Sequence, residues 1–292
     1  MKKLYPHISI TEGACTFPWC NMLLIEDELN ALVDCSPAPE PMEQLKDVRI
    51  DAFYMTHGHC DHVSECFQYY PGAEMLMHPL DIELAASPEL QLMQLGFDIY
   101  PIPDIRAIYL DAAWYSPCTA TGTLQDGQRL STGDVDIDVV HLPGHTPGHC
   151  GFAFPQHGML FTGDIGLDKF GIWCGDTQSQ VGDCIRSIHR IGELQPDVIV
   201  SSHWSIIDKN IPRRLHDYEN IIYQREEAIA KHLRRGRHTI IEIAEEKPIY
   251  GKFNEPWVEL YRMHERMMIL KHLEYMVEKG EVEQDQDIYR LK

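Results

Sequence analysis

Residues 56–62, which read Thr-His-Gly-His-Cys-Asp-His, constrain the fold of this chain more than any other feature. They place three imidazoles and one carboxylate within six positions, at His57, His59, Asp61 and His62. Neutral imidazole nitrogens and carboxylate oxygens are ligands for zinc, iron and manganese. An apolar core would have to supply all four polar side chains with partners at once. We therefore expect this segment to be a loop that binds metal ions.

The composition is that of a globular protein whose larger part is acidic. The 292 residues, 44% of them apolar and 24% charged, suffice for one large and one small domain. The formal charge is −20, and residues 1–212 hold 10 basic against 29 acidic residues, whereas residues 213–292 are almost balanced. Phosphate backbones are normally bound by Lys and Arg. The charge therefore argues against a nucleic-acid partner, although a local basic patch would still allow one.

The chain carries no sequence signal for export or membrane insertion. Residues 1–7 contain no apolar run that resembles a signal peptide, and no stretch approaches the roughly 20 apolar residues of a membrane helix. The nine cysteines are an odd number without a Cys-x-x-Cys pair, which is typical of reduced thiols. We therefore expect a cytoplasmic protein with no membrane partner.

Several expected strands run directly into residues of metal-ligand type. One leads into the His-rich segment, and three others precede the loops with His145, Asp164 and His203. Loops at the ends of rigid strands are common places for chemistry. Apolar and alternating patterns predict strands at 21–25, 31–34, 50–55, 135–142, 159–162 and 197–200, and helices at 39–46, 79–86, 179–194 and 215–233.

The last quarter of the chain has a different character, and we expect two domains, residues 1–212 and 213–292. Thr239 followed by Glu242 predicts a capped helix. The Met-rich pattern at 257–279 predicts a long helix that forms core or a homodimer interface. A small hairpin follows it. This order of helices and hairpin indicates a small C-terminal domain that is winged-helix-like.

The His-x-His-x-Asp-His motif is followed in order by Pro-Gly-His-Thr-Pro-Gly-His, by Thr-Gly-Asp and by a late His after a strand. With these motifs the chain resembles the metallo-β-lactamase fold superfamily. The resemblance implies an α/β fold, an αββα sandwich with two metals at one edge of the sheets. The ligand set resembles that of glyoxalase II, lactonases and tRNA-processing nucleases. The resemblance implies that His57, His59 and His145 hold one metal, that Asp61, His62 and His203 hold the other, and that Asp164 bridges the two.

This ligand set predicts a metal-dependent hydrolase. Two cations about 3.5–4 Å apart share a water and lower its pKa from about 15.7 to about 7, and the bridging hydroxide, oriented by Asp61, attacks the substrate. We expect the substrate to be a small ester, thioester or lactone. The alternatives are a metal-dependent endoribonuclease or phosphodiesterase, and a non-catalytic metal-binding sensor or interaction protein. Zinc is the expected divalent ion, with iron or manganese as alternatives, because ligand type alone does not decide the metal.

Other residues near the motifs have roles that the sequence leaves open. Phe170 and Trp173 are candidates for an apolar substrate pocket, or for packing alone. His149 is expected to orient ligands rather than bind metal. The side chain of Cys60 is expected to point away from the metals. Residues 96–129 lack a clear period and are expected to form an excursion over the site.

Overall fold

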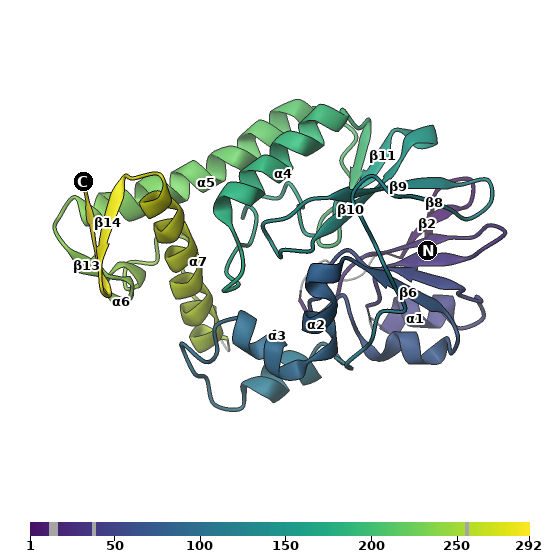
Figure 1. Cartoon of the computed structure of the whole chain (residues 1–292), viewed down its shortest axis with the longest axis horizontal. Coiled ribbons are helices and arrows are strands. Elements are labelled where there is room, and N and C mark those ends of the chain that lie inside the picture. Colours follow the sequence, from purple (N-terminus) through teal and green to yellow (C-terminus); the bar gives the residue numbers. More distant parts are fainter. Residues whose placement is uncertain (12–16, 37–38, 255–256) are drawn as a thin grey trace.

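Two β-sheets pack face to face and are covered by helices on their outer faces (Figure 1). The computed structural model describes residues 1–11, 17–36, 39–254 and 257–292. The expected αββα sandwich is confirmed.

The first sheet has seven strands in the order of the chain, and both of its faces are covered. Strands β1 to β4 pair antiparallel, and β4 to β7 pair parallel. In β3, Leu23 and Ile25 face the second sheet, whereas Met22 and Leu24 face the outer helices. Such alternation requires a strand buried on both sides. The strands are β1 (Lys2–Tyr5), β2 (Ile8–Thr11), β3 (Met22–Ile25), β4 (Ala31–Val33), β5 (Ala52–Tyr54), β6 (Glu74–Met77) and β7 (Gly122–Thr123).

The second sheet has five strands in the order β12-β11-β10-β9-β8. Phe152 and Phe154 of β10 and Val139 of β9 pack against the first sheet, while Val140 turns to the helices on the other side. The core between the sheets is therefore aromatic and β-branched. The strands are β8 (Arg129–Ser131), β9 (Asp136–His141), β10 (Cys150–Phe154), β11 (Met159–Phe161) and β12 (Val198–Val200).

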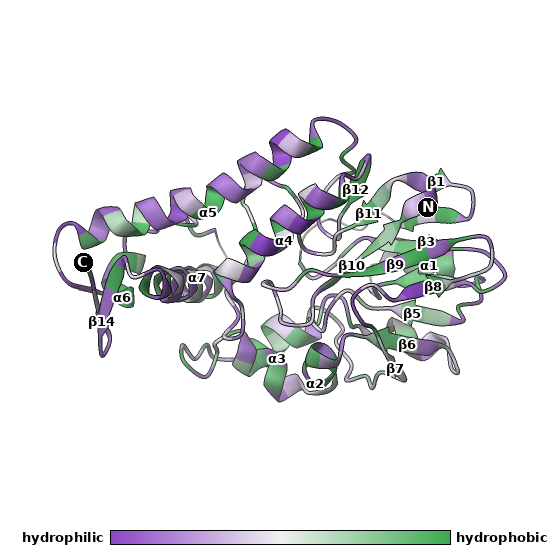
Figure 2. Cartoon of the chain, turned by 45° about the horizontal axis from the view of Figure 1, so that its top comes forward, coloured by the Kyte–Doolittle hydropathy of each residue, from purple (hydrophilic) through white to green (hydrophobic). Residues whose placement is uncertain are grey.

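Amphipathic helices cover the outer face of the second sheet, as the alternating colours along α4 and α5 show (Figure 2). Ile188 of α4 and Ile222 of α5 are buried against the second sheet. Helix α5 begins at Ile211, four residues before the expected start, because Pro212 is favourable in the first helical turn. The helices of the sandwich are α1 (Pro39–Leu45), α2 (Ile82–Ala86), α3 (Pro88–Gln94), α4 (Val181–Leu194) and α5 (Ile211–Leu233).

The C-terminal part is built on the second half of α5. The expected capping box is present, since Glu242 N–H donates to Thr239 Oγ1 and the Glu242 carboxylate accepts from Thr239 N–H. Helix α7 is buried on several sides: Met268 reaches the core beside the second sheet, and Met267 packs on Phe97. These methionines are intramolecular core. The elements are β13 (His238–Thr239), α6 (Ile240–Ala244), α7 (Val258–Glu278), β14 (Val282–Asp285) and β15 (Ile288–Leu291).

The expected division at residue 213 falls inside a continuous helix. Leu215 of α5 packs in the sandwich core, while Leu233 of the same helix packs with Ile243 and Leu273 of the C-terminal part. The two-domain division and the winged-helix-like character of residues 213–292 stay predictions.

Three smaller expectations have clear outcomes. Among the described helices, none is both long and apolar enough to cross a bilayer. Residues 96–129 do contain regular structure, including one π-helical turn at Ala107–Asp111 and strand β7. The expectation of reduced cysteines is wrong for Cys35, which is disulfide-bonded. Six others are buried free thiols, namely Cys20, Cys60, Cys118, Cys150, Cys174 and Cys184.

Candidate metal centre

Three of the expected ligands direct ring nitrogens at one position at the edge of the sandwich. His57 and His59 lie on the loop after β5, and His145 lies on the loop after β9. The Nε2 of His145 is 3.3 Å from Nε2 of His57 and 3.0 Å from Nδ1 of His59. Ligand atoms about 2.0–2.1 Å from a tetrahedral zinc ion lie about 3.3 Å from one another. The three nitrogens therefore have the spacing of a metal-binding triad.

A second group lies directly beside the first and consists of Asp61, His62 and His203. The Nε2 of His203, from the loop after β12, lies 3.3 Å from Asp61 Oδ2 and 3.3 Å from Nε2 of His62. These spacings again suit a common cation.

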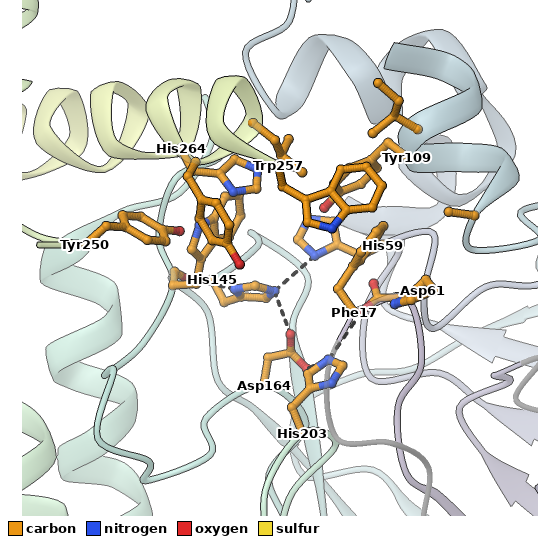
Figure 3. Close-up of a pocket in the computed structure, with 16 residues that line it drawn as sticks. Phe17, His59, Asp61, Tyr109, His145, Asp164, His203, Tyr250, Trp257 and His264 are labelled. Atoms are coloured by element: carbon orange, nitrogen blue, oxygen red, sulfur yellow. Dashed lines mark hydrogen bonds and ion pairs between the residues drawn. The ribbon is translucent and has the colours of Figure 1, made fainter. Parts of the chain in front are cut away.

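Asp164 lies between the two groups (Figure 3). Its Oδ2 is 3.3 Å from Nε2 of His145, and its Oδ1 is 3.1 Å from Nε2 of His62. Oδ1 is buried and accepts no hydrogen bond from the described part of the chain. The structure thus brings all seven expected residues together. Their role as ligands stays a prediction.

The tautomers of the imidazoles test whether this cluster fits metal ions. The Thr56 hydroxyl donates to Asp34, so it accepts from Nδ1–H of His57, and Nε2 of His57 is left with a lone pair. His62 donates through Nδ1 to Asp34 Oδ2, at 2.9 Å. His145 donates through Nδ1 to the carbonyl of Trp173, at 2.8 Å. Each of these rings therefore directs a lone pair at the centre, as the imidazole ligands of a metal ion do.

His59 presents its other nitrogen to the centre, because its Nε2 donates to Asp176 Oδ2 at 2.6 Å. Carboxylates that bond metal-ligating imidazoles fix their orientation and raise their basicity. Asp34 bonds His62 and Asp176 bonds His59 in this way. The sequence analysis predicted neither role. The position of Asp34 at the end of an expected strand was a usable signal, whereas nothing in the sequence near Asp176 indicates its partner.

Asp81, also missed, joins the two ligand-bearing loops. Its buried carboxylate accepts from the Gly58 N–H at 3.1 Å, from the Thr146 hydroxyl at 2.6 Å and from the Gly148 N–H at 2.7 Å. Gly58 belongs to the first loop, and Thr146 and Gly148 to the second. Asp81 therefore fixes the distance between His57 and His145, although its side chain does not face the cavity.

The electrostatics of the cluster suit cations. Burial lowers the pKa of His145, and burial together with His62 holds the pKa of His57 well below its usual value, so both stay neutral. Burial opposes ionisation of Asp61, but His62 and His203 lower its pKa to about 2. Four carboxylates lie in or directly behind the cluster, and two divalent ions would balance their charge. They are Asp34, Asp61, Asp164 and Asp176.

Two neighbouring residues behave as expected. Burial lowers the pKa of His149 to about 3, and its Nε2 accepts the backbone N–H of Asp164 at 3.1 Å. His149 thus positions Asp164 without facing a cation. The Cys60 side chain points away from the cluster and packs with Leu110 and Ala113.

A cavity of about 450 Å³ opens over the cluster. Its floor holds five candidate ligands, and its walls include Trp173 and, from the expected excursion, Ile108 and Tyr109. Phe170 is not among the lining residues; its ring lies 4.8 Å from the Arg225 guanidinium and 4.9 Å from the Tyr250 ring. Of the two residues expected to line a substrate pocket, the structure places only Trp173 there. The five ligands are His59, Asp61, His145, Asp164 and His203.

Comparisons with known proteins show the family of this chain. The family model of the Metallo-beta-lactamase superfamily matches residues 121–203. The hydroxyacylglutathione hydrolase GloC of Haemophilus influenzae is 30% identical over 192 residues, which cover 62% of this chain and 82% of that protein. The chain belongs to the metallo-beta-lactamase superfamily. Its relatives and its His/Asp clusters show that it is a metal-dependent hydrolase of that superfamily. It binds divalent metal.

Other relatives within the superfamily are matched over less of their length. A hydroxyacylglutathione hydrolase of Aeromonas salmonicida is 27% identical over 68% of this chain, but the match spans only 64% of that protein. A probable polyketide biosynthesis zinc-dependent hydrolase of Bacillus velezensis is 30% identical over 53% of this chain and 56% of that protein.

Solved structures of the superfamily show how far the fold is shared. A metallo-beta-lactamase family protein of Thermus thermophilus superposes with a TM-score of 0.78 at 21% identity, over 99% of this chain and 100% of that one. The common fold therefore includes the C-terminal part. A protein solved in a di-iron-bound form has a TM-score of 0.52 at 25% identity, over 68% of this chain and 96% of that one.

Proposed function

We propose that this protein is a dinuclear hydrolase of small acyl thioesters. The observation that carries the proposal is the position of Asp164, whose two oxygens face two adjoining groups of inward-pointing ligand atoms. The di-iron form of a relative supports a pair of ions, and zinc remains the expected metal. The proposed ligands are His57, His59 and His145 for one cation, Asp61, His62 and His203 for the other, and Asp164 for both.

The proposed reaction depends both on the metal ions and on residues of the chain. When bound, two divalent ions would supply an activated water and stabilise the negative charge that develops on a carbonyl oxygen. Asp61 lies in the cavity floor, where its carboxylate can accept a hydrogen bond from that water and orient it. Asp34 and Asp176 accept hydrogen bonds from Nδ1 of His62 and Nε2 of His59, so the opposite nitrogen of each ring faces the ions.

The chemistry of the substrate is proposed from the relatives. Hydroxyacylglutathione is an acyl thioester, and proteins named for its hydrolysis match more than half of this chain. Esters and lactones present the same carbonyl centre and are the second choice. A cytoplasmic location and a homodimer, both expected from the sequence, stay predictions.

The nuclease alternative finds no support in the charges of the site. Among the described residues that line the cavity there is no Lys or Arg, whereas phosphate backbones are held by such side chains. The arginines near the end of α5 pair with acidic side chains instead: Arg234 with Glu227, and Arg235 with Glu246.

Metal analysis combined with turnover tests the proposal. Protein stripped by a chelator and reloaded with zinc, iron or manganese should hold two ions per chain and hydrolyse an N-acetylcysteamine thioester. His203→Ala should lower the metal content towards one ion, while His189→Ala, an exposed imidazole of α4 paired with Glu219, should not. One ion or none in the parent protein, or no thioester hydrolysis with any metal, would refute the proposal.

A further inference from the structure

The cavity wall above the candidate metal centre is built from uncharged, mostly aromatic side chains of distant segments (Figure 3). Tyr109 comes from the segment before β7, and Trp173 from the loop after β11. Tyr250, Trp257 and Tyr261 come from the C-terminal part. The C-terminal part therefore forms much of the substrate side of the cavity, while the sandwich supplies the ligands.

The rings of this wall form a continuous series that starts at the metal centre. The Trp173 ring lies 5.8 Å from the His145 ring and 5.5 Å from the His264 ring. Tyr250 lies 6.4 Å from His264 and 5.5 Å from Tyr261, between ring centroids. Most of these contacts are edge-to-face. An aromatic group of a ligand would contact the rings of the wall favourably in the same geometry.

The wall offers no counter-charge to an ionic group. Lys and Arg are missing from its described lining residues. Burial lowers the pKa of His264 to about 4, so this imidazole is uncharged at neutral pH. A carboxylate or phosphate placed here would lose its hydration without gaining a cationic side chain as a partner. The wall therefore selects uncharged groups.

We infer that the aromatic wall binds an uncharged aromatic group carried by the acyl part of the substrate. This inference rests on the proposed function, because it places the scissile carbonyl over the ligand cluster and the ring between Trp173 and Tyr261. The cavity volume of about 450 Å³ suits a small molecule. The substrate class that follows is an arylacyl thioester rather than an acyl thioester with an acidic side chain.

Binding of non-hydrolysable thioethers tests the wall separately from catalysis. The full-length, metal-loaded protein is titrated with N-acetylcysteamine thioethers that carry either a phenethyl or a carboxypropyl group, and the heat of binding and the tryptophan fluorescence are recorded. The phenethyl compound should bind at least tenfold more tightly and change the fluorescence, because Trp173 and Trp257 line the cavity. Equal or tighter binding of the carboxypropyl compound would overturn the inference.

Two substitutions locate the binding site. Tyr261→Ala should weaken calorimetric binding of the phenethyl compound about tenfold. Trp257→Ala, at a residue that is 43% exposed, should independently weaken it to the same extent. The metal content of both variants should stay at the parent value. Tyr223→Ala on α5 and Trp114→Ala are matched controls, because both rings are exposed and lie outside the cavity lining. Unchanged binding in Tyr261→Ala and Trp257→Ala would refute the assignment.

Turnover of matched thioesters separates this inference from the proposed function. Phenylacetyl-N-acetylcysteamine should be hydrolysed with at least tenfold higher kcat/KM than the succinyl thioester, and Tyr261→Ala should reduce that ratio. If the phenethyl thioether binds but no thioester is cleaved, the proposed reaction is wrong and the aromatic site stands. If the succinyl thioester is the better substrate, the reaction stands and the aromatic site is wrong.

Discussion

Asp176 Oδ2 lies 2.6 Å from Nε2 of His59, although 117 positions separate the two residues in the chain. The bond fixes which nitrogen of His59 faces the centre. Burial alone would lower the pKa of His59, but the Asp176 carboxylate raises it, so the nitrogen that faces the centre is more basic. A residue outside all the ligand motifs thus decides the donor strength of one ligand.

Asp176→Asn should weaken metal binding about 10–100-fold, which is typical when a carboxylate behind a metal ligand is removed. The amide keeps the size of the side chain but lacks the charge that orients His59. Metal affinity is measured by competition with a chromophoric chelator. Asp183→Asn is the control, since Asp183 pairs with Arg186 at the surface of α4. Equal affinity of the parent and Asp176→Asn would show that the carboxylate is dispensable.

Gly58→Ala should damage the centre without changing a ligand. A Cβ at residue 58 would lie 2.7 Å from the backbone oxygen of Asp81 and 3.2 Å from the backbone nitrogen of Ala85. Because neither backbone atom can yield easily, we expect a loss of about 1–3 kcal/mol in the free energy of unfolding, together with lower metal content.

Gly192→Ala provides the matched control for this substitution. Gly192 lies within α4, and a Cβ added there would be 3.7 Å from its nearest neighbour, a methyl carbon of Leu215. The free energy of unfolding of this variant should increase by up to about 1 kcal/mol, because alanine has a higher helix propensity than glycine. Denaturant unfolding of both variants measures the difference. A fully stable, fully metallated Gly58→Ala protein would contradict the tight fit of the ligand loop.

Removing metal should lower the thermal stability. The lone pairs of four buried imidazoles and two carboxylates converge in the centre, and without cations they repel one another. Ions that bind only the folded state should raise Tm on the order of 10 °C when present at about 1,000 times Kd. Calorimetry before and after chelation measures this shift. His145→Ala should show a smaller shift, and an equal one would place the stabilising ion elsewhere.

The stability should also depend on the charge of Asp27, which joins the two sheets far from the metal centre. Its Oδ2 accepts from the Thr132 hydroxyl and from the Val135 N–H, each at 3.0 Å. Burial opposes ionisation, but these hydrogen bonds lower the pKa of Asp27 below its ordinary value. Stability from a lowered pKa is present above the unfolded value of about 4 and is lost as the pH falls through the folded value.

Asp27→Asn should therefore lower the free energy of unfolding at pH 7 by at most about 1 kcal/mol, because solvent screens a carboxylate this close to the surface. The difference from the parent should shrink below about pH 4. Urea unfolding at pH 7 and at pH 3 measures both values. Asp98→Asn, at an exposed residue, should be neutral at either pH. A cost for Asp27→Asn that is independent of pH would show that packing rather than charge is responsible.

Much of the fold and of the candidate centre was predictable because the signals are local. Strands buried on two sides are apolar runs, and the one that ends at Tyr54 leads directly into His57. Capping chemistry at Thr239 is set within four residues. The predicted start of α5 was four residues too late, because the start depends on Pro212 and on packing. Neither of these belongs to the apolar periodicity from which the helix was predicted.

The sequence by itself determined which residues can hold cations, since ligand chemistry belongs to the side chain and the order of the motifs belongs to the chain. Only the tertiary structure decided what surrounds them. Asp81 and Asp176 act through hydrogen bonds to distant segments. The aromatic wall exists because Trp173 and Tyr261, 88 positions apart, line one cavity. Such contacts depend on how elements pack, and a local pattern carries no information about packing between distant segments.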